Sequence, residues 1–127
     1  MPVTIDLKSV EGVAVGVAKG VLTLAEIKQS AATVWKTYGG QEARLLWDLR
    51  EAEFNLSPSE IREWARYSRD GSPYSRVRIA FVVLRDLHFG LVSMFEVFRQ
   101  ADEVEMSVFR DFDEALEWLG QDTGASS

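Results

Sequence analysis

The chain has 127 residues, no cysteine, a single histidine and a formal net charge of −6, and its length fits one domain. The lack of cysteine excludes a disulfide scaffold, a thiolate zinc site and a cysteine nucleophile, and one histidine excludes a multi-histidine metal site. The acidic balance argues against nucleic-acid binding, because phosphate recognition needs positive charge. A hydrophobic content of 46% with 27% charged residues is that of a globular protein.

The sequence shows no targeting or membrane-spanning segment. Its start lacks the basic region and the long apolar core of a signal peptide. The longest apolar stretches, such as Ile79–Leu84, are far shorter than the roughly 20 residues that a membrane helix needs. We therefore expect a cytoplasmic protein with no stable membrane insertion. We also expect one domain over residues 1–120 and a flexible C-terminal tail over residues 121–127.

The first third of the chain predicts a hairpin followed by a helix. Apolar and polar residues alternate over residues 3–8, which is typical of an edge strand, and a second alternating strand follows the turn at Glu11-Gly12. Thr23 and Glu26 form a capping box at the start of a helix with one apolar face. The helix ends at Gly39-Gly40.

The middle third predicts two buried strands separated by a helix. Leu45–Leu49 is a short, nearly continuous apolar run, so we expect it to be buried on both faces. Ser57 and Glu60 form a second capping box, with Pro58 at the first helical position. Residues 77–84 are the most apolar run and the best candidate for a central parallel strand.

The last third predicts a helix, a half-exposed strand and a final short helix. Asp86 is expected to cap the first of these helices, and Phe89 falls on its polar side. The inward face of that helix is predicted to hold Leu87, Leu91, Met94, Phe95 and Phe98. Residues 104–108 alternate apolar and polar, and Asp111 opens the final helix.

These elements predict an α/β fold in the order β-β-α-β-α-β-α-β-α. Strands that alternate with amphipathic helices require a layered structure, here a single-layer, mixed and mostly parallel five-stranded sheet with helices packed on it. The order of the strands in the sheet stays open.

Several charged residues follow the predicted parallel strands, where ligands bind in open sheets. Asp48 and Arg50 end the third strand, Arg85 and Asp86 follow the fourth, and Arg110 and Asp111 follow the fifth. We expect these Arg/Asp pairs to converge at one edge. The candidate ligand- or partner-binding residues are Asp48, Arg50, Arg85, His88, Phe89 and Arg110. The alternative is structural: the carboxylates cap helices, the arginines pair with them, and His88 lies on the surface.

Ser57 and Ser59 lie at a predicted helix start, where the helix dipole tolerates a phosphate, so they are phosphorylation candidates. The alternative is that Ser57 is simply the cap. No glycine-rich phosphate loop and no nucleophile–base pair can be recognised, so we predict no catalytic residues, no metal and no cofactor.

Four segments together resemble a known family. They are residues 20–26, Leu46–Arg50, Phe89–Glu96 and residues 108–119. In order and spacing they resemble the SpoIIAA-like family of small bacterial proteins, which is similar to the STAS and CRAL-TRIO folds. The resemblance covers roughly residues 3–120 and implies a mixed sheet with helices on its faces. The Asp-Ser-Ser/Thr-Gly-type motif that carries the phosphorylatable serine of STAS regulators is absent.

The leading functional hypothesis is a non-enzymatic SpoIIAA/STAS-like module that acts through protein–protein contact or as a homodimer. The alternative is a small carrier that binds an anionic or amphipathic, lipid-like ligand at the carboxyl ends of the strands. An enzyme with Asp48 or His88 as acid or base ranks third. The charge is uneven: residues 86–127 hold ten acidic residues and two arginines, a net charge of −8, which suits self-association or a charged protein partner.

Overall fold

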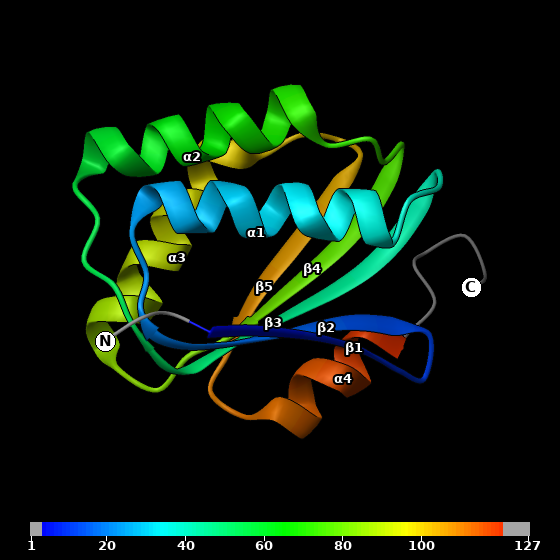
Figure 1. Ribbon diagram of the computed structural model, residues 1–127, viewed down its shortest axis with the longest axis horizontal. Helices are drawn as coiled ribbons and strands as arrows, with labels where there is room; N and C mark the ends of the chain where they lie inside the picture. The colour runs from blue at the N-terminus through cyan, green and yellow to red at the C-terminus, as the bar shows by residue number, and fades with distance from the viewer. Residues whose placement is uncertain (1–3, 121–127) are drawn as a thin grey trace.

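The computed structural model describes residues 4–120, and within them it has five strands and four helices in the predicted order (Figure 1). Residues 1–3 and the predicted tail, 121–127, lie outside the described residues. The elements are β1 (Thr4–Val10), β2 (Val13–Val21), α1 (Leu24–Thr37), β3 (Glu42–Glu53), α2 (Pro58–Gly71), β4 (Arg76–Val82), α3 (Asp86–Arg99), β5 (Val104–Phe109) and α4 (Phe112–Gly120).

The strands lie in the sheet in the same order as in the chain, β1-β2-β3-β4-β5. The β1–β2 hairpin is antiparallel, and the other three strand pairs are parallel. The prediction of a mixed, mostly parallel sheet is therefore confirmed, and so is the prediction that the first strand lies at an edge. β4, which the sequence predicts as a central parallel strand, does lie between two parallel neighbours, but the middle strand of the sheet is β3.

Helices cover both faces of the sheet. α1, α2 and α3 lie on one face and α4 on the other, as Figure 1 shows. The alternation of side chains along β3 explains how one strand serves two cores. Leu45 and Leu49 belong to the core under the three helices, whereas Leu46 packs with Ala115 and Leu119 of α4. The predicted burial of this strand on both faces is confirmed.

Side-chain caps begin three of the helices as the sequence predicts. The Thr23 and Ser57 hydroxyls accept hydrogen bonds from the backbone N–H groups of Glu26 and Glu60, at 3.3 and 3.2 Å. The Asp111 carboxylate accepts a hydrogen bond from the backbone N–H of Glu114, in α4, at 3.0 Å. The prediction for Asp86 is wrong: α3 begins at Asp86 and its N-cap is Arg85. The Asp86 carboxylate instead accepts a hydrogen bond from Arg110.

Two further details differ from the predictions. β3 extends beyond Leu49 to Glu53, because it continues to pair with β2 after a register shift that falls between the β2 residues Val17 and Lys19. Leu87 does not belong to the inward face of α3. Its exposed fraction is 40%, because in the first turn of α3 it is the adjacent His88, 2% exposed and stacked on Phe54, that faces the core.

Candidate functional site

The ends of β4 and β5 are joined by Arg110. Its guanidinium donates to the Leu84 carbonyl oxygen at 2.9 Å and to Asp86 Oδ1 at 2.7 Å. It also lies 4.9 Å from the ring centroid of Phe89, in a cation–π contact. This contact explains the position of Phe89 on the polar side of α3: the half-buried ring supports Arg110. One of the predicted Arg/Asp contacts therefore forms here, between Arg110, directly after β5, and Asp86, the first residue of α3.

A second cluster joins the end of β3 to the start of α3. Glu53 forms an ion pair with Arg85, and its Oε1 lies within hydrogen-bonding distance of His88 Nε2, at 3.2 Å. The hydrogen bond from His88 lowers the pKa of the Glu53 carboxyl below its usual 4.5, and Arg85 lowers it further. Arg85 thus pairs with a glutamate in the extension of β3, and not with one of the predicted aspartates.

The expectation that His88 is a surface residue is wrong. Its exposed fraction is 2%, and its ring stacks on Phe54 with the centroids 4.2 Å apart. Phe54 follows directly after β3, so the extension of this strand is what brings a ring and a carboxylate to the histidine. His88 therefore holds the first turn of α3 against the end of β3.

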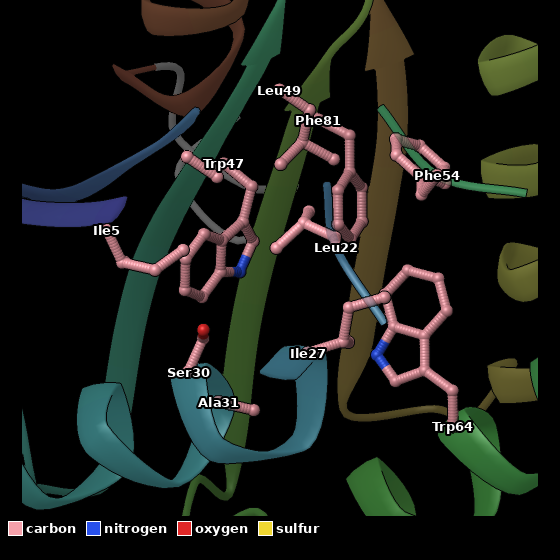
Figure 2. Close-up of a pocket in the computed structure, with 11 residues that line it drawn as sticks. Ile5, Leu22, Ile27, Ser30, Ala31, Trp47, Leu49, Phe54, Trp64 and Phe81 are labelled. Atoms are coloured by element: carbon pink, nitrogen blue, oxygen red, sulfur yellow. The ribbon is translucent and has the colours of Figure 1, made fainter. Parts of the chain in front are cut away.

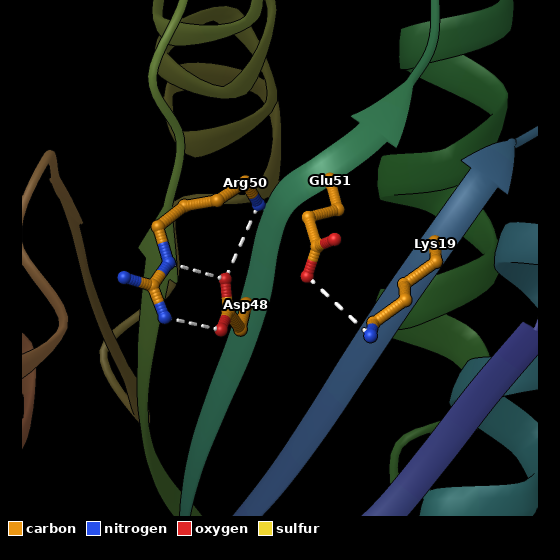
Figure 3. Close-up of polar contacts among 4 residues, drawn as sticks. All are labelled: Lys19, Asp48, Arg50 and Glu51. Atoms are coloured by element: carbon orange, nitrogen blue, oxygen red, sulfur yellow. Dashed lines mark hydrogen bonds and ion pairs between the residues drawn. The ribbon is translucent and has the colours of Figure 1, made fainter.

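Asp48 and Arg50 form a close pair on the α4 face of β3. Arg50 donates two side-chain hydrogen bonds to the Asp48 carboxylate, at 2.8 and 2.7 Å, and a backbone one at 3.2 Å, as Figure 3 shows. Burial raises the pKa of Asp48, but these hydrogen bonds and the charge of Arg50 outweigh it, so the pKa lies below its usual 3.8. Arg50 also lies 5.4 Å from the ring centroid of Phe112.

The predicted convergence is confirmed in part. Arg85, His88, Phe89 and Arg110 lie around the first turn of α3, whereas Asp48 and Arg50 pair with each other closer to α4.

Sequence reasoning missed three exposed apolar residues beside the first group. Val21, which pairs with Glu53, and Leu84 and Leu87, which flank Arg85, have exposed fractions of 50%, 53% and 40%. We use the name strand-end surface for the residues of this region that are not fully buried: Val21, Glu53, Leu84, Arg85, Leu87, Phe89 and Arg110.

Ser57 and Ser59 are both exposed at the start of α2. Ser57 is the N-cap, as the structural alternative expected, and its hydroxyl lies 3.4 Å from that of Ser59. Neither serine contacts the strand-end surface through a hydrogen bond in the described residues.

An apolar cavity of about 50 Å³ lies between α1 and the sheet, and it was not predicted from the sequence. Figure 2 shows the side chains around it: Trp47 from β3, Phe81 from β4, Ile27 and Ala31 from α1, and Trp64 from α2. Phe54, the ring on which His88 stacks, also lines it. The cavity lies under the carboxyl halves of the strands, but its walls are mostly apolar, with Ser30 as an exception, and the predicted charged residues lie outside it.

Within residues 4–120, no group of three or more carboxylate or imidazole side chains is placed to hold a metal ion. None of the helices in this part of the chain combines the length and apolar character needed to span a bilayer.

The sheet order, the antiparallel β1 and the division of helices between the two faces define a SpoIIAA-like α/β fold, as the sequence resemblance implied. The chain is similar to an uncharacterized protein of the DUF3478 family with a SpoIIAA-like fold from Shewanella loihica PV-4. The TM-score is 0.61 at 19% identity, over 92% of this chain and 93% of that one.

The chain is also similar to an anti-sigma factor antagonist from Mycobacterium paratuberculosis. Here the TM-score is 0.63 at 16% identity, over 94% of this chain and 96% of the other. No family model matches the sequence, and no curated protein gives a significant match. At these identities the likeness establishes the fold.

Proposed function

We propose that this chain is a non-enzymatic regulatory module of the cytoplasm that acts by binding a protein partner at its strand-end surface. The observation that carries the proposal is the exposure of Leu84 and Leu87 beside charged side chains whose positions are fixed. Apolar side chains surrounded by ordered polar groups are typical of protein-binding surfaces. Arg110 is fixed by Leu84, Asp86 and Phe89, and Arg85 by Glu53.

The fold supports the regulatory part of the proposal. One solved structure with the same arrangement of strands and helices is an anti-sigma factor antagonist, a name that describes a regulator that acts on another protein. Glu53 and Asp86 balance the charges of Arg85 and Arg110, so we expect the partner to offer an apolar segment flanked by polar groups of both signs.

The test compares two aspartate substitutions on α3. Leu87→Asp puts a charge at the centre of the strand-end surface. Val97→Asp is the matched control, because Val97 is more exposed, at 69%, and lies ten residues further along the same helix, about 15 Å away. Immobilised wild-type and variant proteins are each used to capture a partner from extract of the source cells, and affinity is then measured with the purified partner.

We expect a partner that binds the wild type and Val97→Asp with equal affinity and Leu87→Asp at least tenfold more weakly. If each protein that is captured binds Leu87→Asp as well as it binds the wild type, the strand-end surface is not the binding site and the proposal fails.

The apolar cavity favours a second candidate function, the carriage of a small amphipathic ligand. Its volume suits a short alkyl group. α1 covers it mainly with half-buried side chains, and Val34 is the one residue of this helix that the described structure buries fully. An alkyl chain would contact Trp47 and Phe81, and its polar head would lie near Ser30, the one polar side chain among the residues that line the cavity apart from the indole N–H groups.

Hexanoate is a suitable probe of this candidate, with tryptophan fluorescence as the readout, because Trp47 and Trp64 both line the cavity. Ala31→Leu fills the cavity, and Thr33→Leu is its control on the exposed side of α1. A saturable change in the wild type and in Thr33→Leu that Ala31→Leu abolishes would support a carrier. Equal responses of the three proteins, or the absence of a response, would rule it out.

A further inference from the structure

β1 presents a free edge of the sheet. It pairs with β2 on one side, and within residues 4–120 no strand lies on its other side. An edge strand exposes a row of backbone N–H and C=O groups that can pair with another strand. The direction of each group follows from the register of the β1–β2 hairpin.

Val10 and Val13 close a two-residue turn at Glu11 and Gly12, both of which have positive φ. The closing residues of such a turn hydrogen-bond to each other, and hydrogen-bonded pairs then alternate along an antiparallel ladder. Val10, Lys8, Asp6 and Thr4 therefore direct their backbone groups toward β2. Ile5, Leu7 and Ser9 direct theirs outward.

The side chains of β1 are self-complementary about Leu7. If a second β1 pairs antiparallel with the first so that Leu7 lies opposite Leu7, then Ile5 lies opposite Ser9 and Asp6 opposite Lys8. Asp6 and Lys8 are both exposed, so each strand pair would gain two cross-strand ion pairs on one face. In this register the outward N–H and C=O groups of the three residues 5, 7 and 9 all find partners.

We propose that a second copy of this chain docks on β1, to give a symmetric dimer in which the two sheets join into one. The other edge is less suitable. β5 carries a single charged side chain, Glu105, so it offers no complementary pair. An isologous contact of this kind is closed, because each β1 is used once. The proposal is independent of the proposed function, since residues 4–9 contribute nothing to the strand-end surface.

The test uses charge reversal and mixing. Asp6→Lys sets lysine against lysine across the two-fold axis, and Lys8→Asp sets aspartate against aspartate, so each variant alone should dimerise roughly tenfold or more weakly than the wild type. An equimolar mixture of the two variants sets two lysines opposite two aspartates and should restore the dimer as a heterodimer. Sedimentation equilibrium over a range of concentrations measures all four samples.

A second pair of variants tests whether the outward backbone hydrogen bonds of β1 hold the dimer. Ser9→Pro removes an outward N–H without touching the ladder with β2, which an edge strand tolerates, and Ser9→Ala is the matched control that keeps the N–H. We expect Ser9→Pro to be monomeric and Ser9→Ala to dimerise as the wild type does. Far-UV circular dichroism and urea unfolding check that each variant is folded.

A wild type that stays monomeric over the whole range overturns the proposal, and so does a dimer that the charge reversals and Ser9→Pro leave intact. Neither result bears on partner binding, because the Leu87→Asp comparison is made separately on the strand-end surface. A dimer that weakens in both single charge variants and recovers in their mixture fixes the partner strand and its register.

Discussion

The indole ring of Trp47 occupies the space beside Gly16 on the neighbouring strand. The two residues are paired in register between β2 and β3, and a β-carbon at position 16 would lie 2.7 Å from Trp47 Cε3 and closer still to Cζ3. Trp47 also lines the apolar cavity. The absence of a side chain at Gly16 therefore sets where the indole ring lies, and with it the shape of the cavity.

Gly16→Ala should destabilise the protein by about 1–3 kcal/mol, because a methyl group would displace a large ring within a packed layer. Urea unfolding followed by circular dichroism gives the free energy, and the tryptophan emission of the folded variant should shift. Gly90→Ala is the contrasting case. Gly90 lies in α3 where a β-carbon meets nothing within 4 Å, so this variant should gain up to about 1 kcal/mol in helix stability. Equal effects of the two substitutions would contradict this account.

Asp48→Asn should lower the free energy of unfolding by about 1 kcal/mol. The asparagine side chain cannot form the charge-assisted hydrogen bonds that Asp48 accepts from Arg50. The expected loss of stability is modest, because the Arg50 side chain is 38% exposed and water screens the interaction. The pKa of Asp48 is lower in the folded state than its ordinary 3.8. Its contribution is therefore complete above pH 3.8 and is lost as the pH falls through the folded value. Asp102→Asn, in an exposed turn, is the control and should leave the free energy of unfolding at neutral pH unchanged.

His88→Phe should raise the pKa of Glu53 toward its ordinary 4.5. The ring stack on Phe54 is retained, but the hydrogen bond that lowers this pKa most is lost. Side-chain carbon NMR of Glu53 across the acid range measures the change. Arg85→Met should raise the same pKa by a smaller amount. A larger effect of Arg85→Met than of His88→Phe would show that His88 is not the main partner of Glu53.

Arg99→Met should leave the stability unchanged or raise it by about 1 kcal/mol. Arg99 is 2% exposed, its Nε donates to Ser68 Oγ at 3.0 Å, and its Nη1 has no hydrogen-bond partner among residues 4–120. Burial lowers the pKa of this guanidinium, because the cost of desolvating the charge outweighs the opposing effect of the Glu103 carboxylate. Thermal unfolding at neutral pH tests the expectation, and a clear loss of stability would mean that the guanidinium is better paired than its contacts indicate.

Local signals in the sequence were enough to predict the elements and their alternation. The capping residues Thr23 and Ser57 and the alternation along β1 depend on neighbours within four residues, and such patterns can be read directly. The pairing of Asp48 with Arg50 belongs to the same class, because the two residues lie two apart on one strand.

The parts that could not be predicted depend on long-range geometry. Glu53 reaches Arg85 and His88, 32 and 35 residues away, because β3 continues past its apolar segment. The burial of His88 depends on Phe54 in the same way. The cavity depends on the distance that Trp47 and its neighbours impose between α1 and the sheet, which no periodic pattern encodes.

The order of the strands in the sheet is also their order of synthesis. Each strand pairs with the one made just before it, so each pairing requires the closure of a hairpin turn or of a segment that contains one helix. Loop-closure entropy grows only slowly with the length of the closed segment, but the three parallel pairings each span a helix and form more slowly than the hairpin. The hairpin of β1 and β2 can serve as the template on which β3, β4 and β5 are added in turn while the chain emerges from the ribosome.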